Sequence, residues 1–420
     1  MSRLSIDPGP ERAWCRRPVP TRGRPRIVHV TTVPWSLWSF FRGQFAYMRR
    51  YGLDVAAVCS GGDLVQDIAQ REGVEVYTVP MTRRVTPVQD LVSLVRLTRL
   101  LRRLQPTIVH THTAKAGLLG LLAGVLAGVP IRLYTLHGWM GPVGRLLRWV
   151  EGPRMKLCLR LAHAVPCSSH SLKRKVVEAG LCPADKIRVA GYGSVNGIDA
   201  QNDFNPDRLP AGTRRRVRQE YGIPLDATAM VYVGRLMRSK GVNELAEAWA
   251  RLRARFPNLY LVIVGVAEAH DPASPARIEV LKADPRVHFT GFVKDMPAIY
   301  AAADLLVLPT YSEGMPYSLL EAGAMELPCV ATRVTGCVDV IEDGFNGVLV
   351  EPYSAESLRA GLARLLGDPE ARREMGRRAR QRVLERFRPE VVWRELLAMY
   401  RRLLAQRCPE VKLPDADPAD

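Results

Sequence analysis

Two glutamates lie eight positions apart in the stretch YSEGMPYSLLEAGAMELP, residues 311–328. Glu313 falls in a turn marked by Gly314, and Glu321 falls inside the helix that Pro316 is well suited to begin. Acidic residues near a helix start often do no more than satisfy the helix dipole. If an anion occupies the helix start instead, both carboxylates are free to accept hydrogen bonds from hydroxyl groups. We therefore expect a diphosphate at the helix start, with a sugar hydroxyl on Glu313 and a ribose hydroxyl on Glu321.

A paired-carboxylate hydrolase is the rival interpretation of the same two residues. It would need both groups on either side of one scissile bond. A turn and a helix interior on one short segment are poorly placed for that arrangement.

A second candidate is the basic loop GRLMRSKG, residues 234–241, which follows the apolar run AMVYV. Gly234 at a strand end lets the backbone approach a ligand closely. Arg235 and Lys240 add two cations, as a diphosphate leaving group would need. An ordinary basic loop between a strand and a helix remains the alternative on this segment alone.

Histidines at expected strand ends form a third group. His137 in LYTLHG follows a strand and precedes a glycine, although a lone histidine is more often a structural residue. His110 and His112 in VHTH are weaker candidates, which we interpret as strand-end packing or acceptor-loop residues.

The elements that must position these residues alternate short apolar runs with longer helical stretches from Arg26 onward. This pattern is typical of parallel sheets with helical crossovers. A Gly-, Asn- and Pro-rich linker at 191–212 separates two such series. The sequence therefore predicts two doubly wound α/β domains, and ligands bind at the carboxyl ends of strands in such sheets. The predicted strands are 26–33, 54–60, 74–80, 107–113, 131–138, 229–236, 259–265, 287–293, 304–310, 328–333 and 346–352, with helices at 88–104, 115–127 and, broken near 387–390, 369–405.

The length, net charge and cysteine content of the chain limit which classes of function are plausible. The chain has 420 residues, long enough for two domains, and a formal charge of +18, which favours a phosphate-rich partner such as nucleic acid, an anionic membrane or a nucleotide-linked substrate. Its eight cysteines form no CxxC pair, which favours reduced, mostly structural thiols in a cytosolic protein. The longest apolar run, 118–129, is too short to span a bilayer. The basic segment 1–25 and the tail 409–420 are expected to be disordered.

Taken together, these motifs resemble the retaining glycosyltransferases of family 4. Glu313 and Glu321 match the family's E-x7-E motif, with Gly314, Pro316, Leu320 and Ala322 in their expected places, and Arg235 and Lys240 match its phosphate-binding pair. The stretches 108–120, 133–138, 291–316 and 343–352 are also similar, so the resemblance extends from Ile27 to about Ala405.

The resemblance implies the GT-B fold, two Rossmann-like domains facing across a cleft. The first, 26–200, would take the acceptor, and the second, 213–387, the donor, with a final helix at about 388–405 crossing back to the first. It implies metal-independent, cofactor-independent transfer, with retention, from a UDP- or GDP-sugar to a hydroxyl, on a lipid-linked glycan of surface-polysaccharide synthesis at the inner face of the plasma membrane. The implied catalytic residues are His137, Arg235, Lys240 and Glu313, and the implied donor-binding residues are Gly234, Arg235, Lys240, Phe292, Val293, Glu313, Gly314, Met315, Pro316, Tyr317, Ser318, Leu319 and Glu321.

The sequence departs from the family pattern at three places. The turn after the first strand, 31–40, lacks glycine; Glu326 replaces a usual glycine; and VGVAE, 264–268, lacks the second glycine of VGxG.

Two other function classes are less consistent with the sequence. A dehydrogenase is disfavoured because no GxGxxG joins a strand to a helix. A nucleic-acid-binding protein is disfavoured because aromatic residues do not alternate with the basic stretches.

The excess positive charge suggests a membrane surface. Arg96, Arg99 and Arg103 fall near one face of the predicted helix 91–105, opposite an apolar stripe, and the segment 144–160 adds further charge with one tryptophan: Arg145, Arg148, Trp149, Arg154, Lys156 and Arg160. A solvated basic face over a buried stripe is the commoner outcome. We nevertheless predict peripheral attachment of the first domain to anionic lipid.

Overall fold

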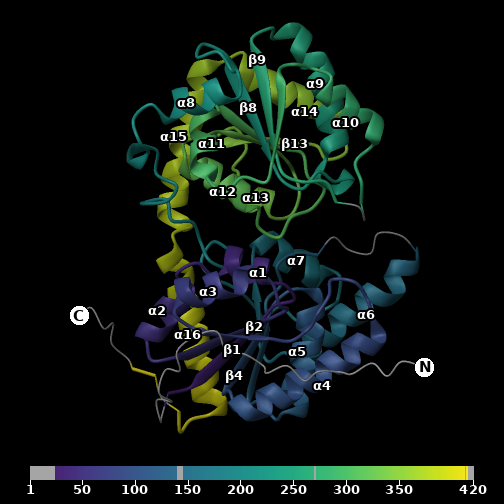
Figure 1. Ribbon diagram of the computed structural model, residues 1–420, viewed down its shortest axis with the longest axis vertical. Helices are drawn as coiled ribbons and strands as arrows, with labels where there is room; N and C mark the ends of the chain where they lie inside the picture. The colour runs from purple at the N-terminus through teal and green to yellow at the C-terminus, as the bar shows by residue number, and fades with distance from the viewer. Residues whose placement is uncertain (1–23, 140–144, 269–270, 412, 415–420) are drawn as a thin grey trace.

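The computed structural model describes residues 24–139, 145–268, 271–411 and 413–414, and of residues 145–151 only the backbone. Two α/β units lie one above the other, and two long helices run along one side of both (Figure 1). The segments 1–25 and 409–420, which we expect to be disordered, fall largely outside the described residues.

The first unit contains a five-stranded sheet in the order β3-β2-β1-β4-β5, with every neighbouring pair parallel. Ile27 and Val28 are both fully buried but belong to clusters on opposite faces of this sheet. Burial on both faces explains why the strands are apolar throughout instead of alternating. The elements are β1 (Arg26–Val30), α1 (Pro34–Phe40), α2 (Gln44–Arg50), β2 (Asp54–Cys59), α3 (Leu64–Glu72), β3 (Glu75–Thr78), α4 (Pro87–Leu104), β4 (Ile108–Thr111), α5 (Ala114–Leu126), β5 (Ile131–Tyr134), α6 (Arg145–Leu161), β6 (Val165–Cys167), α7 (His170–Glu178) and β7 (Ile187–Val189).

The second unit contains a six-stranded parallel sheet in the order β10-β9-β8-β11-β12-β13. Buried clusters again cover both faces. Its elements are α8 (Thr213–Glu220), β8 (Thr228–Val233), α9 (Val242–Arg255), β9 (Leu259–Val264), α10 (Pro275–Lys282), β10 (Val287–Gly291), α11 (Met296–Ala302), β11 (Leu305–Leu308), α12 (Tyr317–Ala324), β12 (Cys329–Thr332), α13 (Cys337–Val340), β13 (Gly347–Val350) and α14 (Ala355–Leu366).

The last two helices connect the units. α15 (Pro369–Arg386) packs against α12, whereas α16 (Pro389–Arg407) packs against α2 and β5 of the first unit. The buried stripe of α16 has helical spacing and joins a core cluster of the first sheet: Leu396, Leu397, Tyr400, Leu403 and Leu404. The chain therefore crosses between the units twice, and the crossings touch, since Ile198 N–H donates to Phe387 C=O at 2.8 Å.

The predicted fold class, two Rossmann-like parallel-sheet domains, is confirmed. The short parallel pair β6-β7 was not predicted, because three-residue strands carry little periodic signal. Pro316 is the N-cap residue of α12 instead of its first helical residue. The seven cysteines in the described part are free and buried, as expected for structural thiols.

Candidate active site

Loops at the carboxyl ends of both sheets meet between the two units. The turn after β11 contains Gly314, and a Cβ atom there would lie 1.5 Å from the carbonyl oxygen of His137, which follows β5. Only a residue without a Cβ fits this approach. The E-x7-E turn therefore packs directly on the LYTLHG loop of the other unit.

Glu313 and Lys240 form an ion pair in this region, with Lys240 Nζ 2.5 Å from Glu313 Oε1. Their side chains are 14% and 18% exposed, so both charges are largely withdrawn from solvent. Gly241, at φ +70°, brings the basic loop against the end of β11, because a Cβ there would lie 1.9 Å from Pro309 O. Thus the two motifs predicted from sequence are adjacent in the structure.

Arg235 lies apart from that pair. Its Nη1 is 3.4 Å from Glu268 Oε1, and its side chain is 46% exposed. Glu268 belongs to the VGVAE segment, whose retained Gly265 allows close packing, since a Cβ there would lie 1.9 Å from Gly234 O. Because Arg235 itself is exposed and this ion pair is long, Arg235 can exchange Glu268 for a ligand at little cost.

The start of α12 offers backbone N–H groups to an anion. Pro316 provides no side-chain cap, and no acidic side chain lies in the first turn of this eight-residue helix. The Tyr317 hydroxyl accepts a hydrogen bond from Ser194 Oγ at 3.2 Å across the units. The side chains of Met315 and Leu319, two predicted donor-binding residues, are buried.

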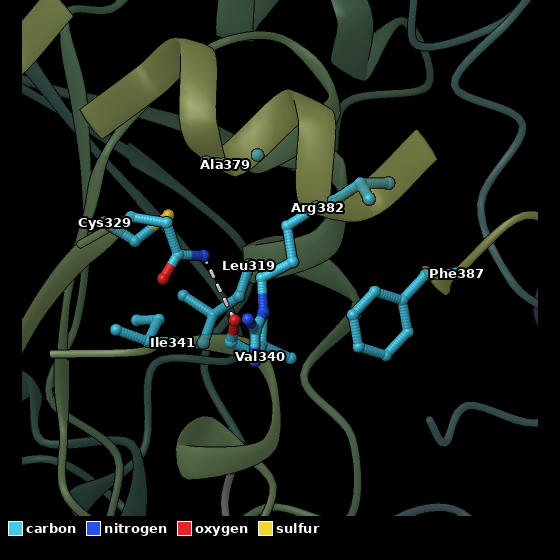
Figure 2. A pocket seen from close by; sticks show the side chains of 10 residues that line it. Leu319, Cys329, Val340, Ile341, Ala379, Arg382 and Phe387 are labelled. Carbon is cyan, nitrogen blue, oxygen red and sulfur yellow. Dashed lines mark hydrogen bonds between the residues drawn. The ribbon is translucent and has the colours of Figure 1, made fainter. Parts of the chain in front are cut away.

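A small cavity lies behind α12, on the side facing α15 (Figure 2). Leu319, Cys329, Val340 and Phe387 contribute apolar side chains to it, and Arg382 extends alongside. Leu319 is the only predicted site residue among the described residues that line this cavity. This cavity is therefore a packing defect of the core and not the candidate site.

Glu321 lies one turn into α12, where Tyr300 of α11 donates a hydrogen bond from its hydroxyl to Oε2 at 2.7 Å. Burial raises the pKa of the Glu321 carboxyl, and the Tyr300 hydrogen bond opposes that shift. Sequence reasoning missed Tyr300, which carries no motif of its own.

Among the other predicted residues, His137 is stacked on Phe40, with ring centroids 4.7 Å apart. Burial lowers the pKa of His137 to about 4, so its imidazole is neutral at pH 7. Phe292 is 56% exposed and meets Trp35 of the first unit edge-on at 5.3 Å, whereas Val293 packs against the core. Ser318 is half-buried at the start of α12.

One group among the described residues has metal-ligating atoms close together: His29, His110 and His112, within 4.8 Å of one another. Both ring nitrogens of His110 are already engaged at 2.6 Å, by Tyr400 Oη and Thr135 Oγ1. A metal ion would have to break one of these bonds and would remain without a carboxylate to offset its charge. Of the two interpretations given for His110 and His112, strand-end packing or acceptor-loop residues, their burial agrees with packing.

A further contact between the units had no signal in the sequence. Asp339 of α13 accepts hydrogen bonds from Ser171 of α7, from the backbone N–H at 3.0 Å and from the hydroxyl. The Ser171 hydroxyl in turn accepts from Gly336 N–H at 2.9 Å. These bonds join the start of α7 in the first unit to α13 in the second, beside Gly314.

Comparison with known proteins supports the family resemblance found in the sequence. The family described as glycosyl transferases group 1 matches residues 213–382, and the glycosyl transferase 4-like domain matches residues 37–193. The capsular polysaccharide biosynthesis glycosyltransferase CapM of Staphylococcus aureus is 30% identical over 91% of this chain and 98% of its own. The Escherichia coli UDP-Gal:alpha-D-GlcNAc-diphosphoundecaprenol alpha-1,3-galactosyltransferase is 27% identical over 83% of this chain and 89% of its own.

Solved structures support the fold. Anabaena HepE in complex with UDP-glucose superposes with a TM-score of 0.74 at 18% identity, covering 89% of this chain and 99% of that one. Sucrose-phosphate synthase from Thermosynechococcus elongatus gives 0.74 at 21% identity, covering 91% and 100%. With two matching domains, a full-length relative at 30% identity and the E-x7-E turn seated on its partner loop, this chain belongs to the group 1 glycosyltransferases of the family 4 type.

Proposed function

We propose that this enzyme transfers a hexose-type sugar from a nucleoside diphosphate to a hydroxyl acceptor, with retention at the anomeric carbon and without a metal ion. The observation that carries this proposal is the Lys240–Glu313 pair, which lies next to the uncapped start of α12 and opposite His137. A cation, a set of backbone donors and an acceptor carboxylate converge there on one segment.

The diphosphate leaving group is bound by Lys240, by Arg235 and by the N–H groups at the start of α12. Preorganised charges of this kind stabilise developing negative charge in a partly desolvated site. In this proposal these side chains and backbone donors carry the leaving-group charge without a metal ion.

Retention follows a front-face reaction in this proposal. The bond from the anomeric carbon to the phosphate oxygen breaks, the acceptor oxygen bonds to the same face, and the departing phosphate oxygen takes the acceptor proton. Glu313 accepts a hydrogen bond from the sugar, and Glu321, oriented by Tyr300, accepts from the ribose. No side-chain nucleophile is required.

The donor is a UDP-sugar in this proposal, in preference to a GDP-sugar. The support comes from relatives, since HepE was solved with UDP-glucose and the E. coli enzyme is named for UDP-Gal. The E. coli name also includes a diphosphoundecaprenol acceptor. A lipid-linked glycan in surface-polysaccharide synthesis is accordingly the proposed acceptor.

The surface of α4 provides a membrane-binding face for such an acceptor. Val88 is 80% exposed and Leu91 is 63% exposed, and the same exposed face continues to Arg96 and Arg99. The predicted apolar stripe opposite the arginines is buried, but these additional exposed apolar residues were not predicted. An apolar strip continuous with arginines fits the headgroup region of an anionic bilayer. No helix in the described part of the chain has the length and hydropathy to cross a bilayer.

A donor screen tests the transferase proposal. Thermal stabilisation is measured with UDP-, GDP- and ADP-sugars, and a ligand at about 100 times its dissociation constant adds about 2.7 kcal/mol. We expect a UDP-sugar to stabilise the protein, NMR of the product to show the donor's anomeric configuration, and a chelator to leave turnover unchanged. Inversion or strict dependence on Mg²⁺ or Mn²⁺ would contradict the mechanism.

Vesicle flotation tests the membrane-binding face. Wild-type protein should float with anionic vesicles at low salt, and high salt should reverse this by screening the arginines. Val88→Gln with Leu91→Gln should reduce flotation, whereas Leu225→Gln, at an exposed leucine of the second unit, should not. Equal binding to neutral vesicles would exclude this surface as an anionic-lipid site.

A further inference from the structure

Three histidines form a continuous chain from the core of the first unit to the candidate active site. The parallel register pairs His29 of β1 with His110 of β4, and His112 follows two residues later with its ring against that of His29. His29 Nδ1 lies 3.1 Å from His112 Nε2, and His112 Nδ1 lies 3.2 Å from His137 Nε2. His29 is 0% exposed and His112 is 2% exposed.

All three rings are neutral at pH 7, because burial lowers the pKa of each: His29 to about 3, His137 to about 4, and His112 well below its usual value. A neutral imidazole carries one N–H and one lone pair. The proton position on one ring therefore determines the proton position on the next. Only two arrangements of the protons on these three histidines satisfy both hydrogen bonds.

The inner end of the chain decides between the two arrangements. His29 Nε2 is buried and has no hydrogen-bond partner among the described residues. A buried N–H without an acceptor is rarer than a buried acceptor without a donor. His29 Nε2 is therefore unprotonated, and His29 carries its proton on Nδ1. His29 Nδ1–H then donates to His112 Nε2, and His112 Nδ1–H donates to His137 Nε2.

We propose that His29 and His112 are positioning residues, which hold His137 as the neutral Nδ1–H tautomer so that this N–H donates to an oxygen of the bound nucleotide sugar. His137 Nδ1 has no hydrogen-bond partner among the described residues, and Phe40 stacks on one face of the ring. His110 stands outside this chain because Tyr400 and Thr135 occupy both of its nitrogens. The role of the outer N–H rests on the proposed function, whereas the tautomer does not.

The tautomer is measured on the free, full-length protein by long-range ¹H–¹⁵N NMR of histidine-labelled material. His137→Gln identifies the His137 signal. We expect a protonated Nδ1 and a bare Nε2 in the wild type. A protonated Nε2 on His137, or an even mixture, overturns the proposal whether or not the enzyme transfers sugar. The expected tautomer in a protein that transfers no sugar would refute the proposed function but leave the histidine chain standing.

Variants at His112 separate positioning from a structural role. His112→Phe should leave His137 as a mixture of tautomers and lower kcat/KM by about 10- to 100-fold, by analogy with partners that orient metal-ligating imidazoles. His112→Asn places an amide N–H near the former Nδ1 and should restore the tautomer and most of kcat/KM. His110→Asn, at an equally buried histidine of β4, should leave the His137 signal unchanged. An unaltered His137 signal in His112→Phe would overturn the proposal, and the wild-type spectrum still tests it if that variant fails to fold.

Discussion

Gly314→Ala isolates the contact on which the candidate site depends. The new Cβ would lie 1.5 Å from His137 O, and contacts of this type below 3.0 Å are essentially never seen. The two backbones must therefore separate by at least 3.0 − 1.5 = 1.5 Å. Neither atom belongs to a side chain that could rotate away, so the strain falls on the seam between the two units.

The expected loss follows from that displacement. A misplacement of about 1 Å in a preorganised site costs about 100-fold in rate. We expect kcat/KM of Gly314→Ala to fall by at least about 100-fold, corresponding to about 2.7 kcal/mol of transition-state stabilisation. Calorimetry should show that the free nucleoside diphosphate still binds, because Lys240, Arg235 and Glu321 all belong to the second unit.

Gly61→Ala is the matched control, since a Cβ at Gly61 meets nothing within 4 Å. It should retain wild-type kcat/KM and melting temperature. Activity of Gly314→Ala within about threefold of the wild type would refute the closed contact. Loss of nucleotide binding would show that the turn itself had collapsed, which would also refute the reasoning.

Four other outcomes are expected. Lys240→Ala should lower turnover by about 100-fold, the typical cost of one preorganised charge stabiliser, measured by initial rates at saturating donor. Glu321→Gln should weaken nucleotide binding by about 1.5–3 kcal/mol. Glu313→Gln should impair sugar transfer, although calorimetry should still detect nucleotide binding. The reverse pattern would exchange the roles of the two glutamates. Glu326→Gly should raise the free energy of unfolding by about 1 kcal/mol, since Glu326 adopts φ +62° at the end of α12, and an unchanged urea midpoint would contradict this. The free energy of unfolding should fall as pH drops from about 6.5 toward 4. The reason is that the pKa of His137 is lowered to about 4 in the folded protein, so the unfolded state binds a proton more tightly than the folded state does. Urea unfolding at pH 7.5 and at pH 5 tests the sign.

Local signals in the sequence were sufficient for the architecture and for most of the chemistry. Continuous apolar runs indicated strands buried on both faces, and 107–113 and 259–265 contain β4 and β9. The helix break near 387–390 matches the gap between α15 and α16. The unusual Glu326 was visible as a departure from the family pattern, and its positive φ is a conformation that favours the glycine expected there.

Partners that come from distant segments could only be seen in the folded chain. Periodicity states which face of an element is buried but not what covers it, because that depends on strand register and on how helices cross. The register between β1 and β4 brings His29 to His112, and the packing of α11 beside α12 brings Tyr300 to Glu321. Likewise, a glycine in a turn predicts a close approach, but only the arrangement of the two units determines that Gly314 meets the carbonyl of His137.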